Sequence, residues 1–113
     1  EVIRDLSKKI SDLRNLGVND IIVDPGFGFG KTTKHNYELL NHLSDFNILE
    51  TPVLIGVSRK RMINDVLGTT PETALNGTSA LHAFALERGV NILRVHDVKE
   101  AKELITLHQT LHS

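Results

Sequence analysis

The residues that could do chemistry gather in three short stretches of the sequence. The first, DPGFGFGKTT, runs from Asp24 to Thr33 and combines a carboxylate, glycines and a lysine. It is not a Walker A loop, because Pro25 stands where the first glycine of that motif should lie. It is not a dinucleotide loop either, because Lys31 replaces the third glycine of G-x-G-x-x-G. The loop therefore serves another kind of ligand, or its glycines only permit positive φ in a tight connection.

The other two stretches are SRK, at 58–60, and RVHD, at 94–97. Arg94 follows apolar residues, and a charged side chain there needs a partner or a ligand. Ordinary structural explanations remain open for the rest: Asp24 before Pro-Gly can form a turn, SRK can be a solvated loop, and Asp97 can cap a helix. The other histidines lie in helical patterns and are predicted to be structural: His35, His42, His82, His108 and His112.

The elements that must position these residues alternate along the chain. Apolar spacing predicts an amphipathic helix ending near Gly17, followed by helices at 33–46, 62–67, 71–88 and 98–111. Thr32 or Thr33 would cap the second of these helices, and Asp97 the last. Short apolar runs predict strands beginning near residues 21, 53 and 92, and the first reads as a strand buried on both faces.

This order predicts the α/β class, with one helix followed by three strand-helix units and a parallel sheet with right-handed crossovers. A small doubly wound sheet and a part of a (β/α)8 barrel both fit. The chain begins inside a helix pattern without methionine, which favours the barrel, with 1–113 as a portion of a single domain. In both architectures ligands bind at the carboxyl ends of the strands, so the three stretches are expected to meet there.

Composition excludes several classes of protein. The chain has 113 residues, 40% of them apolar, with a net charge of −1 and no cysteine. We therefore expect one domain, no nucleic-acid partner, no disulfide and no cysteine-ligated zinc. No apolar run approaches the ~20 residues of a membrane span, so we expect a cytoplasmic protein without a membrane partner.

Taken together, DPGFGFGK followed by HNYELL, then GVSRK, then RVHDV resemble the C-terminal part of the dihydropteroate synthases, folate-pathway enzymes with a TIM-barrel fold. The resemblance covers essentially all 113 residues. It implies a transferase that condenses 6-hydroxymethyl-7,8-dihydropterin diphosphate with p-aminobenzoate to give 7,8-dihydropteroate and diphosphate. Pterin-dependent methyltransferases share the barrel and the aspartate, but SRK and RVHDV favour the synthases.

The resemblance also implies roles for the residues that would bind the pterin and drive catalysis. Asp24 would accept hydrogen bonds from the pterin 2-amino group and ring N3–H. Lys60 would donate to the pterin carbonyl and ring nitrogen, and Arg94 would lie over the pterin face and reach the anion. His96 would lie at the diphosphate. Lys60, Arg94 and His96 are thus the predicted catalytic residues.

Further residues would bind substrate around this group. Gly28 would let the backbone pass close to the pterin, and Phe29 would contact the p-aminobenzoate ring. Ser58 and the start of the helix after Lys60 would face the aminobenzoate carboxylate. Arg61 stands where some family members have serine, and it could serve that carboxylate instead.

The same resemblance implies a magnesium ion whose ligand lies outside this segment, so no metal ligand is predicted within it. It also implies a homodimer paired through C-terminal helices, and sulfonamides as competitors of p-aminobenzoate. Residues 1–113 by themselves are expected to turn over little or no substrate. Two alternatives remain: a non-catalytic pterin-binding fragment, and another phosphate-binding barrel enzyme, for example one that acts on sugar phosphates.

Overall fold

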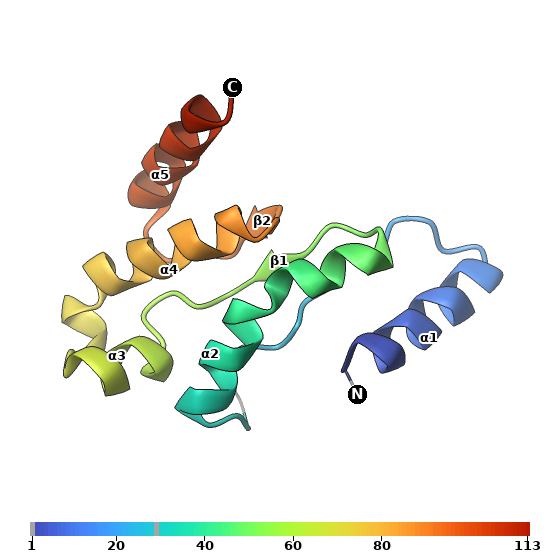
Figure 1. Cartoon of the computed structure of the whole chain (residues 1–113), viewed down its shortest axis with the longest axis horizontal. Coiled ribbons are helices and arrows are strands. Elements are labelled where there is room, and N and C mark those ends of the chain that lie inside the picture. Colours follow the sequence, from blue (N-terminus) through green and yellow to red (C-terminus); the bar gives the residue numbers. More distant parts are fainter. Residues whose placement is uncertain (1, 29) are drawn as a thin grey trace.

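The computed structural model describes residues 2–28 and 30–113. Helices and short strands alternate along it (Figure 1), in the order α1 (Val2–Asn15), α2 (Thr33–Asn41), the 3-10 helix η1 (Leu43–Leu49), β1 (Leu54–Ile55), α3 (Arg61–Leu67), the 3-10 helix η2 (Pro71–Thr73), α4 (Leu75–Glu87), β2 (Ile92–Leu93) and α5 (Val98–Leu111). Among the described residues, no helix combines the length and the apolar character that a membrane span requires.

The sheet is small and parallel. Strands β1 and β2 pair with Leu54 opposite Ile92 and Ile55 opposite Leu93. The first predicted strand is present only as an isolated parallel bridge between Val23 and Val53. The α/β class is confirmed, and the predicted strand segments lie side by side in chain order, although each is shorter than its apolar run.

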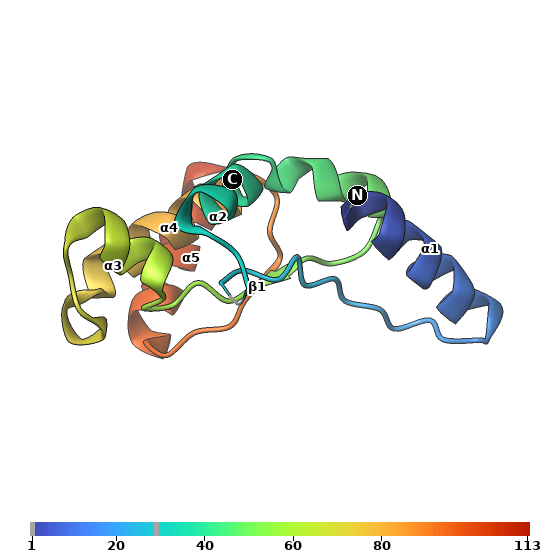
Figure 2. The ribbon, with the colours of Figure 1, turned by 90° about the horizontal axis from the view of Figure 1, so that it is seen from below.

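Side chains along these segments alternate between a covered face and an open face. Val23, Val53, Ile55 and Val57 are at most 3% exposed, and they pack into the core. Figure 2 shows α2 and η1 above the strand segments, on one side of them. Ile22, next to the bridge, is 56% exposed, so within the described residues the first strand segment is buried on one face and open on the other, not buried on both as predicted.

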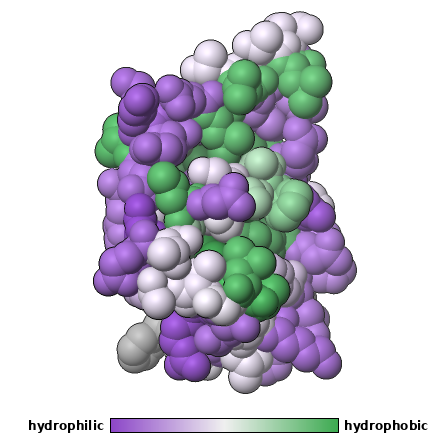
Figure 3. Space-filling model, turned by 90° about the vertical axis from the view of Figure 1, so that its left-hand side faces the viewer, coloured by the Kyte–Doolittle hydropathy of each residue, from purple (hydrophilic) through white to green (hydrophobic). Residues whose placement is uncertain are grey.

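The overall shape reflects this uncovered face. The Cα radius of gyration is 14.9 Å and the extents are 45 × 35 × 20 Å, whereas a compact domain of this length has a radius of gyration of about 13 Å. Apolar residues also reach the surface at the end where α3 lies (Figure 3), among them Val66 and Leu67. The chain is thus a thin layered slab with its strand ends accessible.

Two helices differ from their predicted extents. The helix predicted at 33–46 ends at Asn41 and continues as η1. Leu43, Phe46 and Leu49 are all buried, and their spacing of three matches the three residues per turn of a 3-10 helix. The helix predicted from Pro71 begins instead with η2, and α4 starts at residue 75. Thr70 precedes this segment and forms a capping box with Thr73.

Other helix ends follow the sequence signals. Thr32 caps α2, and its hydroxyl accepts a hydrogen bond from the backbone N of His35 at 3.1 Å. Gly68 ends α3 with φ of 69°, a left-handed conformation that costs glycine little. These caps fix where the loops after the strand segments return to the helical layer.

Candidate functional site

Arg94 lies on the open face because the strand beside it carries a glycine. The backbone N of Arg94 donates to the carbonyl of Ile55 at 2.9 Å, which continues the β1–β2 register and brings Gly56 alongside. A Cβ at Gly56 would lie 2.6 Å from Nη2 and 2.9 Å from Nε of Arg94. The guanidinium therefore lies directly across Gly56, on the same face as the exposed side chains of Asp24 and His96.

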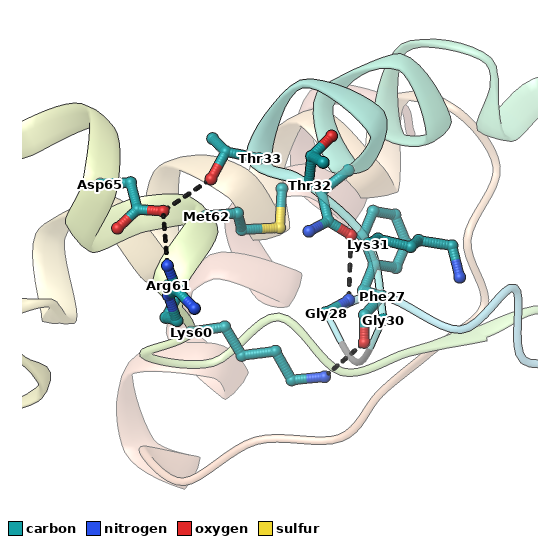
Figure 4. Close-up of a pocket in the computed structure, with 11 residues that line it drawn as sticks. Phe27, Gly28, Gly30, Lys31, Thr32, Thr33, Lys60, Arg61, Met62 and Asp65 are labelled. Carbon is teal, nitrogen blue, oxygen red and sulfur yellow. Dashed lines mark hydrogen bonds and ion pairs between the residues drawn. The ribbon is translucent and has the colours of Figure 1, made fainter.

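Lys60 connects the second strand end to the glycine loop. Its Nζ donates to the carbonyl of Phe27 at 3.0 Å (Figure 4), and a Cβ at Gly28 would lie 3.2 Å from its Cδ. Burial lowers the pKa of Lys60, and the positive charge of Arg94 lowers it further, while the carboxylate of Asp24 opposes both effects. Lys60 thus lies within the electrostatic reach of Arg94 and Asp24.

The glycine loop is held from within. Oδ1 of Asp24 accepts from the backbone N of Gly26 at 2.9 Å, the turn-forming bond expected of an aspartate before Pro-Gly. Asn36, buried in α2, accepts from the backbone N of Gly28 at 2.9 Å, and Nζ of Lys31 donates to the carbonyl of Gly26 at 2.6 Å. Asp24 therefore serves the turn through Oδ1, and no described residue donates a hydrogen bond to its Oδ2.

Arg59 belongs to the SRK stretch, but its role in the site was not predicted from the sequence. Its φ of 57° turns the chain between Ser58 and Lys60, so these two residues do not lie in one extended segment. Its guanidinium makes two hydrogen bonds to Asp97, each of 2.9 Å, and a third to the carbonyl of Pro71. This pair joins the loop after β1 to the loop after β2.

Asp97 was predicted to cap α5, but its carboxylate pairs with Arg59 instead. It occupies the N-cap position but makes no capping hydrogen bond with its side chain. The hydrogen bonds from Arg59 lower the pKa of Asp97, against a smaller opposing effect of desolvation. A guanidinium matches both carboxylate oxygens at once, which a backbone N–H of α5 cannot do. The prediction of a side-chain cap is therefore wrong.

Ser58 and His96 meet through the backbone. The backbone N of His96 donates to Oγ of Ser58 at 3.3 Å, and Ser58 is 6% exposed. The hydroxyl predicted to face a ligand is thus occupied between two loops, whereas the imidazole of His96 is exposed.

A cavity of about 620 Å³ opens between the glycine loop, the start of α2 and the start of α3 (Figure 4). Of the predicted site residues, Gly28, Lys60 and Arg61 line it. Arg61 has a 90% exposed side chain with Nη2 3.8 Å from Oδ2 of Asp65, and Thr33 donates to the same oxygen at 2.7 Å. The walls thus carry three cations, Lys31, Lys60 and Arg61, one carboxylate, Asp65, and apolar side chains such as Met62.

The predicted site residues therefore form two adjoining groups. Asp24, Arg94 and His96 lie on the open face of the strand segments, and Gly28 and Arg61 line the cavity, with Lys60 between the two groups. Phe29 lies outside the described residues. A flat ligand on the open face would meet a carboxylate at its edge and two cations.

The open face is a poor magnesium site. Mg²⁺ prefers several oxygen ligands, and Asp24 is the single carboxylate among these described residues, with Lys60 and Arg94 as its charged neighbours. A group that could hold a metal lies elsewhere in the described chain and consists of Glu87, His108 and His112. The H-x-x-x-H spacing at the end of the sequence could have signalled it.

Comparisons with known proteins agree with this geometry. The family model described as pterin binding enzyme matches residues 1–96. Dihydropteroate synthase of Escherichia coli K12 is 42% identical over 105 residues, which are 91% of this chain and 37% of that protein. The chain spans about a third of the length of the curated relatives it matches.

Solved structures agree as well. Dihydropteroate synthase of Yersinia pestis with a pterine-sulfa conjugate superposes with a TM-score of 0.94 and 37% identity, over 98% of this chain and 45% of that one. Dihydropteroate synthase of Thermus thermophilus in complex with 4-aminobenzoate superposes with a TM-score of 0.93 and 39% identity, over 99% of this chain and 46% of that one. The chain belongs to the family of pterin binding enzymes.

Proposed function

We propose that the protein containing this chain is a dihydropteroate synthase, and that the chain supplies the C-terminal three strand-helix units of its TIM barrel. The observation that carries the proposal is the position of Lys60, whose Nζ donates to the carbonyl of Phe27 and whose side chain lies against Gly28 in the loop that begins at Asp24. Relatives of that name at about 40% identity over nearly the whole chain support it.

The open face would hold the pterin. Its 2-amino group and ring N3–H would donate to Asp24, whose Oδ2 accepts no hydrogen bond from a described residue. Arg94 lies across Gly56 and would stack on the pterin ring. Lys60 would donate to the pterin carbonyl, and its partial burial strengthens such a hydrogen bond relative to one in water.

In the reaction, the C–O bond between the pterin methylene and the diphosphate breaks, and the diphosphate leaves with the electron pair. The amine of p-aminobenzoate forms the new C–N bond and releases a proton to solvent. Arg94 and His96 would stabilise the charge that develops on the leaving group, since both lie exposed on the open face.

The cavity beside Lys60 would receive p-aminobenzoate. Its cations, Lys60 and Arg61 among them, suit a carboxylate, and the apolar side chains of its lining, such as Met62, suit a benzene ring. We place sulfonamides at the same position as competitors. Solved relatives that carry 4-aminobenzoate or a pterine-sulfa conjugate support this assignment of ligands.

Magnesium, a homodimer and a cytoplasmic location complete the proposal. The magnesium ligands would lie outside this segment, because the residues of the open face do not fit the ion. Exposed apolar residues on the last helix, Leu107 and Leu111, support pairing through C-terminal helices.

The direct test is synthesis of 7,8-dihydropteroate by the purified protein, followed by chromatography. We predict that Asp24→Asn lowers kcat/KM at least about 100-fold, because two hydrogen bonds to a charged acceptor, each contributing roughly 1.5 kcal/mol or more, are lost or weakened. Asp20→Asn is the matched control, because Asp20 is an exposed aspartate near the start of the same segment, and we expect its activity to stay within about twofold.

Two other outcomes are informative. Full activity of the Asp24→Asn protein would contradict the assignment of the pterin edge. Saturable pterin binding without product from the wild-type protein would indicate a non-catalytic pterin-binding protein instead.

A further inference from the structure

Glu87, His108 and His112 bring three metal-ligating side chains to one point, at the far end of α5 from the candidate functional site. Their ligand atoms all lie within 4.8 Å of one another. His108 lies ten residues beyond Val98, so about 15 Å of helix separates this cluster from the loop that carries His96. The proposed function makes no use of these residues.

The geometry of the cluster is convergent. Nε2 of His112 lies 2.8 Å from Oε1 of Glu87, and Nε2 of His108 lies 3.2 Å from the same oxygen. Residues four apart on a helix share one face, so α5 presents both imidazoles to the end of α4, the helix that it contacts. The ring centroids are 4.5 Å apart.

Hydrogen bonding alone leaves one atom of this cluster unsatisfied. Nε2 of His112 is within hydrogen-bonding geometry of Glu87, but the buried Nε2 of His108 has no hydrogen-bond partner among the described residues. Its short distance to Oε1 therefore lacks the angle of a hydrogen bond. A buried polar atom of this kind is costly unless something binds it.

We propose that Glu87, His108 and His112 form a binding site for a borderline divalent transition ion such as Zn²⁺. Zinc bound at about 2.0–2.1 Å holds tetrahedral ligand atoms roughly 3.3 Å apart. Here the two imidazole nitrogens lie 3.2 and 2.8 Å from Oε1 of Glu87, and all three ligand atoms lie within 4.8 Å of one another, so small side-chain movements would admit the ion. Two imidazoles and one carboxylate suit zinc, nickel or copper and disfavour magnesium. The ion would clip the C-terminal end of α5 to the end of α4 and keep a fourth position open.

The experiment uses purified protein without a histidine tag, with Zn²⁺ titrated by calorimetry and Co²⁺ by its visible d–d absorption. We expect one equivalent of ion at this site, with Co²⁺ bands typical of a low-coordinate N/O environment, and a rise in Tm with Zn²⁺. His112→Ala and Glu87→Gln should each weaken binding at least about tenfold, since even partners outside the ligand shell contribute 10–100-fold. Both residues are exposed at helix ends, so the fold should persist, as far-UV circular dichroism would verify.

His42→Ala is the matched control. His42 also pairs with a carboxylate on a neighbouring turn, Asp45, at 3.7 Å, but no second imidazole joins it among the described residues. The control should bind Zn²⁺ as the wild type does. Absence of Zn²⁺ binding to the wild type, or binding that His112→Ala and Glu87→Gln leave unchanged, would overturn the proposal and make the cluster a hydrogen-bonded helix contact only.

Discussion

At the scale of single residues, the position of Arg94 depends on a residue that contributes no side chain. The sequence marked Arg94, because a charge after an apolar strand needs a partner. It did not mark Gly56, whose importance arises only from the register that sets it beside Arg94. A glycine in a strand often marks such a close approach, but which group approaches depends on the neighbouring strand.

Replacement of Gly56 by alanine should therefore displace Arg94 and weaken pterin binding about tenfold or more, a loss on the order of 1.4 kcal/mol. The atoms that a Cβ would meet belong to the end of a flexible side chain, so the free energy of unfolding should change by less than about 1 kcal/mol. Calorimetric titration with a pterin measures the first effect, and chemical denaturation the second.

A double-mutant cycle separates this mechanism from a general disturbance of the strand. If Gly56→Ala acts through Arg94, it should have no further effect on pterin binding in an Arg94→Ala background. An equal additional loss in both backgrounds would contradict the explanation.

At the scale of elements, the pair of Arg59 and Asp97 fixes the two loops that carry Lys60 and His96. Both side chains are 22% exposed, and the pair is bidentate. Two parallel hydrogen bonds fix the relative orientation of the guanidinium and the carboxylate, which a single contact from a lysine would not do. The sequence predicted the helix that follows Asp97 and misassigned its carboxylate. An aspartate before a helix can either cap that helix or pair with a nearby arginine. The position of Arg59, set by its positive φ, decides for the pair.

This pair predicts a pH dependence of stability. The pKa of Asp97 is lowered in the folded protein from its ordinary value of 3.8. The pair therefore stabilises the fold at pH values above that ordinary value, and the contribution is lost as the pH falls through the folded-state pKa. We expect Asp97→Asn to unfold more easily than wild type at neutral pH, with the difference shrinking under acidic conditions.

Chemical denaturation between neutral and acidic pH measures this difference, with Asp20→Asn as the control for loss of an exposed carboxylate. Arg59→Lys keeps the charge but loses the bidentate geometry, so at neutral pH it should destabilise the protein by no more than Asp97→Asn does. A difference between wild type and Asp97→Asn that stays constant across the whole pH range would refute the role of the pair.

At the scale of the whole molecule, the alternation of helices and strands was predictable because apolar spacing differs between the two. The lengths of the strands were not, since pairing depends on neighbours that a sequence window does not contain, and Val23 makes only a single bridge. The change from α-helix to 3-10 helix after Asn41 was also not predicted. The spacing of Leu43 and Phe46 fits both kinds of helix, and the packing of these side chains in the core decides which one forms. The open face could not be predicted from apolar runs alone.

The site was also predictable in part, because the order of the strands was predictable. Strand order brings the polar strand ends to one edge, and this argument predicts that Lys60 lies near Asp24 and Arg94, whose charges act on the pKa of Lys60 in the structure. It could not anticipate that Ser58 would be buried against the backbone of His96, because that depends on the turn at Arg59.

The central claim is that Asp24, Lys60 and Arg94 hold one planar heterocycle, and a crystal structure of the protein with bound 6-hydroxymethylpterin tests it most directly. We predict the pterin edge on Asp24 and its carbonyl on Lys60 at hydrogen-bond distances of about 2.7–3.2 Å, with the guanidinium of Arg94 over the ring. A pterin bound elsewhere on the protein, with these three side chains directed to separate partners, would contradict the account.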